Sequence, residues 1–209
     1  MLAVLLHEVS HGKILYRTLF YLPAVISGFV VIYLWKLFYA PTDYGIFNQL
    51  LAMVGIEKLR WLSDPALAML CCVLPTIWAH IGPGCLIYLA ALKGIPDDMY
   101  EAADLDGASF FQKVRHIVYP SLKSLIIIQF IGAFIAAAQS GGFILVMTFG
   151  GPNQATQVAE LEIFQKAYLS LRFGTAVTMA WILGSALLGF TVLQLRRLSN
   201  MEFKTTGSV

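Results

Sequence analysis

Charged residues are scarce in this chain of 209 residues, because Asp, Glu, Lys and Arg together make up only 12% of it. The formal net charge is only +2, and the sequence has no block of basic residues. These features exclude nucleic-acid binding as a function. Hydrophobic residues make up 58% of the chain, and the mean hydropathy is +0.74. This composition is typical of a protein that crosses a membrane several times.

Cysteine is also rare, with three residues in the whole chain. Cys71 and Cys72 are adjacent, and Cys85 lies in the same apolar run. This spacing fits neither a disulfide framework nor a metal site, so we expect buried, unreactive thiols. The sequence also lacks the Gly-x-x-x-x-Gly-Lys-Ser/Thr loop that binds nucleotide phosphates.

Four apolar stretches are long enough to cross a bilayer as helices, which takes roughly 20 residues. They are Thr18–Tyr39, Ala66–Leu92, Leu125–Thr148 and Gly174–Leu195. The predicted fold is therefore an all-α polytopic membrane bundle, a single domain over residues 1–209, with both chain ends on one side of the membrane. Of the 14 lysines and arginines, nine fall on the side of the chain ends and five at or on the other side. The excess places the ends and the 93–123 loop in the cytoplasm.

Two of the predicted spans contain residues that are unfavourable against lipid. Pro75 and Gly82-Pro83-Gly84 are expected to break the helix of the second span, and Gln139 and Ser140 lie within the third. We expect these two spans to line a polar path, with His80, Gln139, Ser140 and Phe143 on it. His80 has the alternative of bonding a backbone carbonyl as a neutral ring.

Two further expectations concern segments near the external side. Lys36 lies near the external end of the first span, so its side chain is expected to extend to the membrane surface. The Val158–Leu171 segment follows turn-forming residues, and it is expected to form an interfacial helix.

The most informative segment is a polar stretch between two apolar runs, residues 93–123. Pro96 precedes Glu101-Ala102-Ala103-Asp104-Leu105-Asp106-Gly107, and Ile117 and Pro120 follow. This pattern predicts a short helix, a glycine turn, a second amphipathic helix, and a proline that opens the next apolar run.

The spacing of Glu101, Ala102, Ala103, Gly107, Ile117 and Pro120 resembles the "EAA" cytoplasmic loop of the permeases of ATP-binding-cassette importers. Tyr119 stands where that pattern has Leu. Four further segments resemble the sugar-type branch of this family: Thr18–Pro23, Asp43–Asn48, Trp61–Pro65 and Met147–Pro152. Together these segments extend over nearly the whole chain and keep the family's order.

The resemblance implies a bundle whose family core has six spans, four of them complete here. Met1–Leu6 would be the last turn of a preceding span, so the chain is expected to be a fragment or to have its start set too far downstream. The implied function is that of a permease subunit for a carbohydrate or related solute in a prokaryotic plasma (inner) membrane, without catalytic activity of its own.

The resemblance also implies partners. These are a second permease in a heterodimer, two cytoplasmic ATPase subunits that hold ATP and Mg²⁺, and an external solute-binding protein. The chain itself would need no cofactor or metal. The residues implied to couple it to the ATPase are Glu101, Ala102, Ala103, Asp106, Gly107, Ile117 and Pro120.

One alternative is an enzyme. His7-Glu8-Val9-Ser10-His11 fits His-Glu-x-x-His, a zinc-binding pattern with a carboxylate as base. Asp106 would then be the third ligand of an intramembrane metalloprotease. Three features weigh against this hypothesis. The histidine pair lies at the end of a span and not inside one, Gly12 directly after the motif would stop the helix, and Asp106 already belongs to the coupling pattern.

Overall fold

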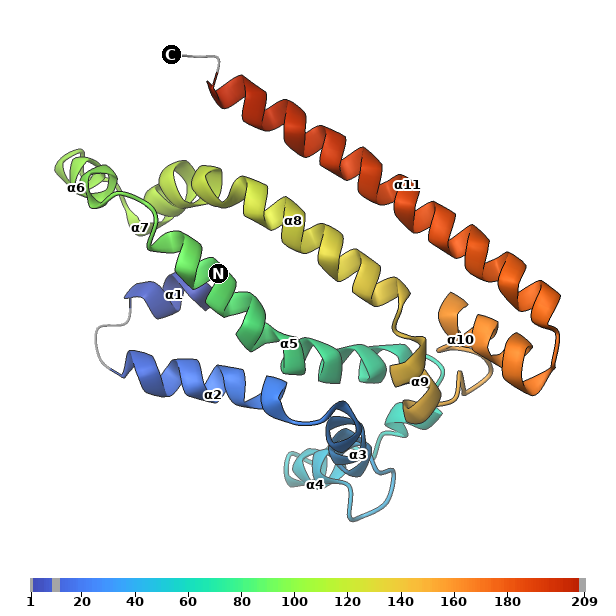
Figure 1. Ribbon diagram of the computed structural model, residues 1–209. Helices are drawn as coiled ribbons and strands as arrows, with labels where there is room; N and C mark the ends of the chain where they lie inside the picture. Colours follow the sequence, from blue (N-terminus) through green and yellow to red (C-terminus); the bar gives the residue numbers. More distant parts are fainter. Residues whose placement is uncertain (1, 9–11, 207–209) are drawn as a thin grey trace. The chain divides into compact units, whose positions relative to one another are not determined.

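The computed structural model describes residues 2–8 and 12–206, and this part of the chain contains helices and no strand (Figure 1). The all-α prediction is therefore confirmed. The α-helices are α1 (Leu2–Glu8), α2 (Lys13–Val25), α3 (Gly28–Phe38), α4 (Ile46–Met53), α5 (Ala68–Leu92), α6 (Asp97–Leu105), α7 (Phe110–Lys113), α8 (Tyr119–Ala138), α9 (Gly141–Met147), α10 (Ala159–Phe164) and α11 (Phe173–Thr206). A 3₁₀ turn, η1 (Trp61–Ser63), and two π-helical turns, η2 (Val114–Val118) and η3 (Gln165–Leu169), complete the set.

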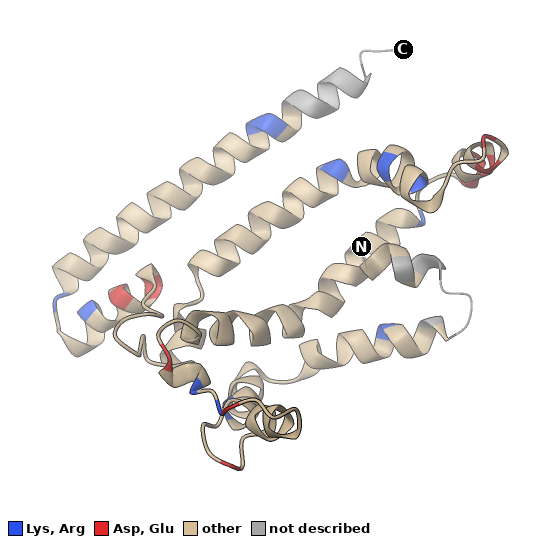
Figure 2. Ribbon diagram, turned by 180° about the vertical axis from the view of Figure 1, so that it is seen from behind, with Lys and Arg blue, Asp and Glu red and all other residues tan. Residues whose placement is uncertain are grey.

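Among the described residues, three helical stretches are long and apolar enough to cross a membrane: Ala68–Leu92, Phe110–Ala138 and Phe173–Ser199. A fourth span results if α2 and α3 are counted as one broken span. Figure 2 shows that α8 and α11 carry no charged residue over most of their length. Large apolar side chains on α11, such as Trp181 at 73% and Leu188 at 67%, are exposed. Such surfaces are stable only against lipid or another apolar partner.

The chain forms two compact units. Unit 1 comprises residues 1–23, 81–133 and 191–209, and unit 2 comprises residues 24–80 and 134–190. The nine lysines and arginines assigned from sequence to the cytoplasmic side all belong to unit 1, and the other five belong to unit 2.

Each unit has its own apolar core. In unit 1, residues of α1, α5, η2 and α8 are buried together, with Leu89 at 3% and Leu92 at 2% exposure. The core of unit 2 includes Ile32 of α3, Cys71 and Cys72 of α5, Ile144 of α9 and Leu161 of α10. All three cysteines are free and buried, as expected from the sequence.

The expectation that Pro75 and Gly82-Pro83-Gly84 break the second span is wrong, because α5 continues through both from Ala68 to Leu92. Gly82 instead allows two helices to approach closely. A Cβ atom there would clash with the carbonyl oxygen of Phe20 and lie 2.8 Å from the Cα atom of Tyr21, both on α2. A residue that lacks a side chain is needed at such a backbone contact.

The helical breaks lie in the first and third of the four predicted spans. Thr18–Tyr39 is interrupted between Val25 and Gly28, and the Leu125–Thr148 stretch is interrupted after Ala138. At the second break the Ser140 hydroxyl donates to the Ala137 carbonyl over 2.8 Å. A serine side chain that bonds the backbone in this way competes with the helical ladder.

Candidate functional site

The segment 93–123 folds as predicted at its N-terminal end. Ile95 is buried at 8% exposure and anchors the segment to the unit 1 core. Pro96 precedes the first turn of α6, and Asp97 and Asp98 lie in that turn. Carboxylates at this position stabilise the positive end of the helix dipole.

Gly107 ends α6 as the sequence predicts. Its φ is +69°, a left-handed conformation that favours glycine. The Ala108 amide donates to the Ala103 carbonyl over 2.9 Å, and the Gly107 amide donates to the Asp104 carbonyl over 3.1 Å. This pair of bonds is the Schellman motif, which satisfies the last carbonyls of a helix.

Two contacts fix the helices that follow. The Ser109 amide donates to Oε1 of Gln112 over 2.6 Å at the start of α7. The Lys113 ammonium pairs with the Asp104 carboxylate, which joins α7 to α6. Because the Asp104 side chain is 64% exposed, the pair adds little stability, about 0–1 kcal/mol. It does restrict the angle between the two helices.

Pro120 lies in the first turn of α8, at the start of the apolar run, as the sequence predicts. The helix is continuous from Phe110 to Ala138 and passes through the π-turn η2 just before Pro120. In that turn the Tyr119 amide donates to the Val114 carbonyl, a wider i to i−5 bond. Pro120 has no amide hydrogen, and a local π-turn accommodates that gap in the backbone ladder.

The seven residues predicted for coupling fall into two groups. Glu101, Ala102, Asp106 and Gly107 are exposed on α6 and its turn, and Pro120 is exposed on α8. Ala103 and Ile117 instead face inward, with Ile117 at 8% exposure in the unit 1 core. Ile117 therefore anchors the loop and is not available for contact with a partner.

The exposed face of α6 and α7 combines acidic and apolar groups. Leu105 is 90% exposed and Phe111 is 72% exposed, and the acidic residues Glu101 and Asp106 are exposed as well. A cavity of about 340 Å³ lies between α6 and α7 and includes Asp106, Gln112 and His116 in its lining. Such a surface suits a protein partner with a basic rim and an apolar pocket.

The four residues predicted for the path all belong to unit 2. Gln139 and Ser140 form the break between α8 and α9, and Phe143 lies in the first turn of α9. His80 is exposed on α5, and its Nδ1 lies 2.8 Å from the Thr76 carbonyl. The alternative of a ring bonded to a backbone carbonyl is thus present in the structure.

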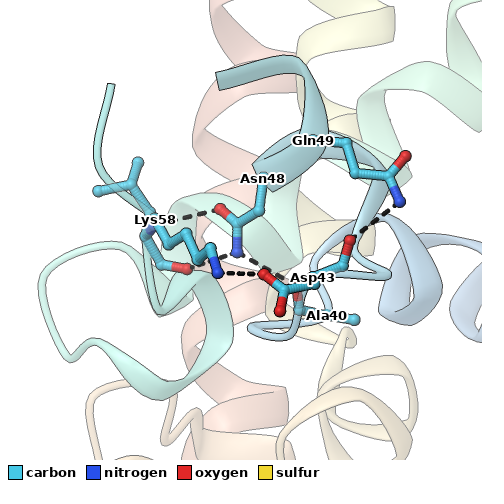
Figure 3. Close-up of polar contacts among 6 residues, drawn as sticks. Ala40, Asp43, Asn48, Gln49 and Lys58 are labelled. Atoms are coloured by element: carbon cyan, nitrogen blue, oxygen red, sulfur yellow. Dashed lines mark hydrogen bonds and ion pairs between the residues drawn. The ribbon is translucent and has the colours of Figure 1, made fainter. Parts of the chain in front are cut away.

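Asn48, which the sequence marks only as part of the Asp43–Asn48 motif, is the centre of a hydrogen-bond network. It is 1% exposed, and its amide donates to the carbonyls of Ala40 over 3.3 Å and Leu59 over 3.1 Å. Its Oδ1 accepts from the Leu59 amide over 3.1 Å and from Nε1 of Trp61 over 2.9 Å. The Asn48 side chain thus joins the segment before α4, at Ala40, to the segment after α4, at Leu59 (Figure 3).

The same loop is further fixed by its charged and polar residues. Gln49 donates to the Asp43 carbonyl over 2.9 Å, and Lys58 forms an ion pair with the Asp43 carboxylate (Figure 3). Gly45 has no room for a side chain, because a Cβ atom would clash with the Ala40 carbonyl. An asparagine flanked by turn formers and a tryptophan was the available sequence signal for this ordered loop.

The metalloprotease hypothesis gains no support from the structure. His11 lies outside the described residues, and His7 and Glu8 are described only as part of α1. Asp106 is an exposed residue at the end of α6. Within residues 2–8 and 12–206, no group of three or more His, Cys, Asp and Glu side chains is placed to hold a metal ion.

Comparison with known proteins identifies relatives over nearly the whole chain. The chain is 36% identical over 188 residues to the probable ABC transporter permease protein YesP of Bacillus subtilis, covering 87% of this chain and 59% of the relative. It is 32% identical over 195 residues to the trehalose/maltose transport system permease protein MalF of Thermococcus litoralis, covering 93% and 65%. The chain thus spans about six tenths of the length of the curated relatives it matches.

The fold is also found among solved structures. A chain of a bacterial ABC transporter involved in the import of the acidic polysaccharide alginate superposes with a TM-score of 0.87 at 22% identity, covering 95% of this chain and 70% of that one. The family model for the binding-protein-dependent transport system inner membrane component matches residues 1–202. The chain therefore belongs to this family of membrane transport components.

Proposed function

We propose that this chain is the permease subunit of an ATP-binding-cassette importer, and that it couples to a cytoplasmic ATPase through residues 93–123. The observation that carries the proposal is the geometry of that segment. A short helix with an acidic first turn and a Schellman turn at its C-terminal end presents Glu101 and Leu105 outward, while Ile95 and Ile117 anchor its base in the core. A rigid element of this kind can transmit a displacement from a partner into the spans.

The proposed orientation places unit 1, with both chain ends and the 93–123 segment, on the cytoplasmic side of a prokaryotic inner membrane. The larger share of lysines and arginines in unit 1 supports this orientation. ATP and Mg²⁺ would be held by two ATPase subunits, so that hydrolysis takes place on the partners.

The proposed solute is a carbohydrate or a related compound. Relatives named for sugars support this, among them the MalF protein and the diacetylchitobiose uptake system permease protein NgcF of Streptomyces coelicolor, which is 29% identical over 186 residues. One solved neighbour is an alginate transporter in complex with a pentasaccharide-bound periplasmic protein. We therefore propose a second permease and an external solute-binding protein as further partners.

The proposal is tested by uptake into proteoliposomes. The complete transporter, with its sister permease, ATPase and binding protein, is offered radiolabelled maltose, trehalose, alginate oligosaccharides and glycerol phosphate. We expect ATP-driven accumulation of at least one of these solutes, dependent on the binding protein. A complex that assembles but neither accumulates any of them nor increases ATP hydrolysis when they are added with the binding protein would contradict the proposal.

The polar path is tested by cysteine reactivity. Single cysteines at His80, Gln139, Ser140 and Phe143, in a variant without native cysteines, should react with a small polar thiol reagent in the assembled transporter. Solute, binding protein and ATP should change the rate at these positions. A cysteine at Leu188, on the exposed apolar face of α11, is the control and should react slowly. Equal, unchanging rates at all five positions would place the path elsewhere.

A further inference from the structure

α9 is a short helix of seven residues whose two ends both receive a charged side chain from another helix. It lies in unit 2 directly after the Gln139–Ser140 break and contributes Ile144 and Met147 to the core. A helix of this length leaves nearly all its terminal amides and carbonyls without partners inside the helix. In an apolar environment these groups need partners from elsewhere.

Glu160 of α10 supplies the partner at the N-terminal end. Its Oε2 accepts a hydrogen bond from the Gly141 amide over 2.5 Å. Ser140 occupies the capping position, but its hydroxyl donates to the Ala137 carbonyl of α8 instead. The contact is close, since a Cβ atom on Gly141 would lie 2.6 Å from the Leu161 amide nitrogen and 2.8 Å from the Glu160 Cβ.

Lys36 of α3 supplies the partner at the C-terminal end. Its ammonium donates to the Val146 carbonyl over 2.9 Å. From the sequence this side chain is expected to extend to the membrane surface, which stays a prediction; the structure adds the bond to Val146. Lys36 is the single charged residue of α3, and its stem follows an apolar helix to reach a carbonyl in the last turn of α9.

The signs of the two charges match the dipole of the helix between them. A carboxylate lies at the amide end and an ammonium lies at the carbonyl end, which is the stabilising arrangement at both termini. The contact points, Gly141 and Val146, are separated by about 7.5 Å of helix rise. The two charges therefore act on α9 from separate helices and from opposite ends.

We propose that Glu160 and Lys36, here called the α9 clamp, are positioning residues for solute passage. They hold α9 in place, and with it the Gln139–Ser140 break and Phe143. The inference rests on the proposed importer function and adds to it two residues that act through α9. Neither residue needs to touch the solute.

The chain offers a matched control. Glu162 lies on α10 two residues beyond Glu160, and it pairs with Lys166 of η3 over 3.3 Å and with Nε2 of Gln157 over 2.6 Å. Both side chains of that ion pair are 33% exposed. Glu162→Gln and Lys166→Met remove the same charges as Glu160→Gln and Lys36→Met without affecting either end of α9.

The experiment uses the complete transporter and two readouts. The first is uptake, and the second is the thiol reactivity of Gln139→Cys in a variant without native cysteines. Glu160→Gln and Lys36→Met should each lower uptake by about fivefold to tenfold and raise the reactivity at position 139 several-fold, because one end of α9 is released. Lys36→Arg keeps the charge and the donor, so it should retain at least about half the uptake. The control variants should stay within about twofold of wild type.

The double variant Glu160→Gln/Lys36→Met separates action through α9 from direct pairing. If Glu160 and Lys36 act independently at the two ends of α9, the fold losses of uptake in the single variants should multiply in the double variant. If the two residues instead formed a direct ion pair, the double variant would transport no worse than either single variant. Clamp variants that match the controls in both readouts would overturn the proposal. If the wild-type complex transports nothing, the importer function fails, but the reactivity at position 139 still tests the clamp.

Discussion

Replacing Gly107 with valine is expected to abolish solute uptake while leaving the permease in the membrane at a near-normal level. Gly107 has a φ of +69°, and a Cβ atom there would meet no other atom within 4 Å. The penalty is therefore purely conformational, about 1–3 kcal/mol for a non-glycine residue in this region and more unfavourable when the side chain is branched. α6 would lose its Schellman turn and its fixed direction. Uptake and membrane level, measured in the same vesicles, check this result.

A matched substitution separates conformation from contact. Gly107→Asn should keep much of the uptake, because asparagine tolerates the left-handed conformation. Glu101→Lys changes the charge of the exposed face without changing the turn, and it should weaken co-purification of the ATPase. Normal uptake in both Gly107→Val and Glu101→Lys would refute the coupling role.

Replacing Gly82 with valine is expected to prevent accumulation of the folded permease. The added side chain would displace the backbone of α2 at Phe20 and Tyr21, and backbone cannot move aside as a flexible side chain can. Overpacking of this kind costs about 1–3 kcal/mol, and more where main chain is displaced. Membrane level and thermal unfolding in detergent provide the measurement.

Gly84 is the control for Gly82. It lies two residues further along the same helix, and a Cβ atom there would meet nothing within 4 Å. Gly84→Ala should be tolerated or slightly stabilising, by up to about 1 kcal/mol, since alanine favours the helix. If Gly82→Val accumulates and unfolds like Gly84→Ala, the close contact between α2 and α5 is not a feature of the folded protein.

The structure of the 93–123 segment was largely predictable because its signals are local. Pro96, the acidic first turn, and Gly107 act on residues within one or two turns, so their effects can be inferred from spacing. The helical breaks were less predictable. Gly82-Pro83-Gly84 contains strong helix breakers. Gly82, however, is needed for a close contact with α2, about 60 residues earlier in the chain. The local pattern contains no information about that contact.

The polar contacts of unit 2 escaped prediction for the same reason. Lys36 and Val146 are 110 positions apart, and Glu160 and Gly141 are 19 apart. A lysine in an apolar helix has several ways to satisfy its charge, including reaching the membrane surface. The tertiary packing determines which of these the lysine side chain adopts, and a single sequence does not contain that information.

Cross-linking at Leu105 tests most directly whether this chain couples an ATPase to a membrane path. Leu105 is 90% exposed on α6, so a photoreactive residue there would lie within the proposed contact, while one at Leu188 on α11 serves as the control. We expect Leu105 in the complete transporter to cross-link to the ATPase subunit, with a yield that changes when ATP is added, and Leu188 to give no such product. An ATPase product at Leu188 and none at Leu105 in either nucleotide condition would contradict the account.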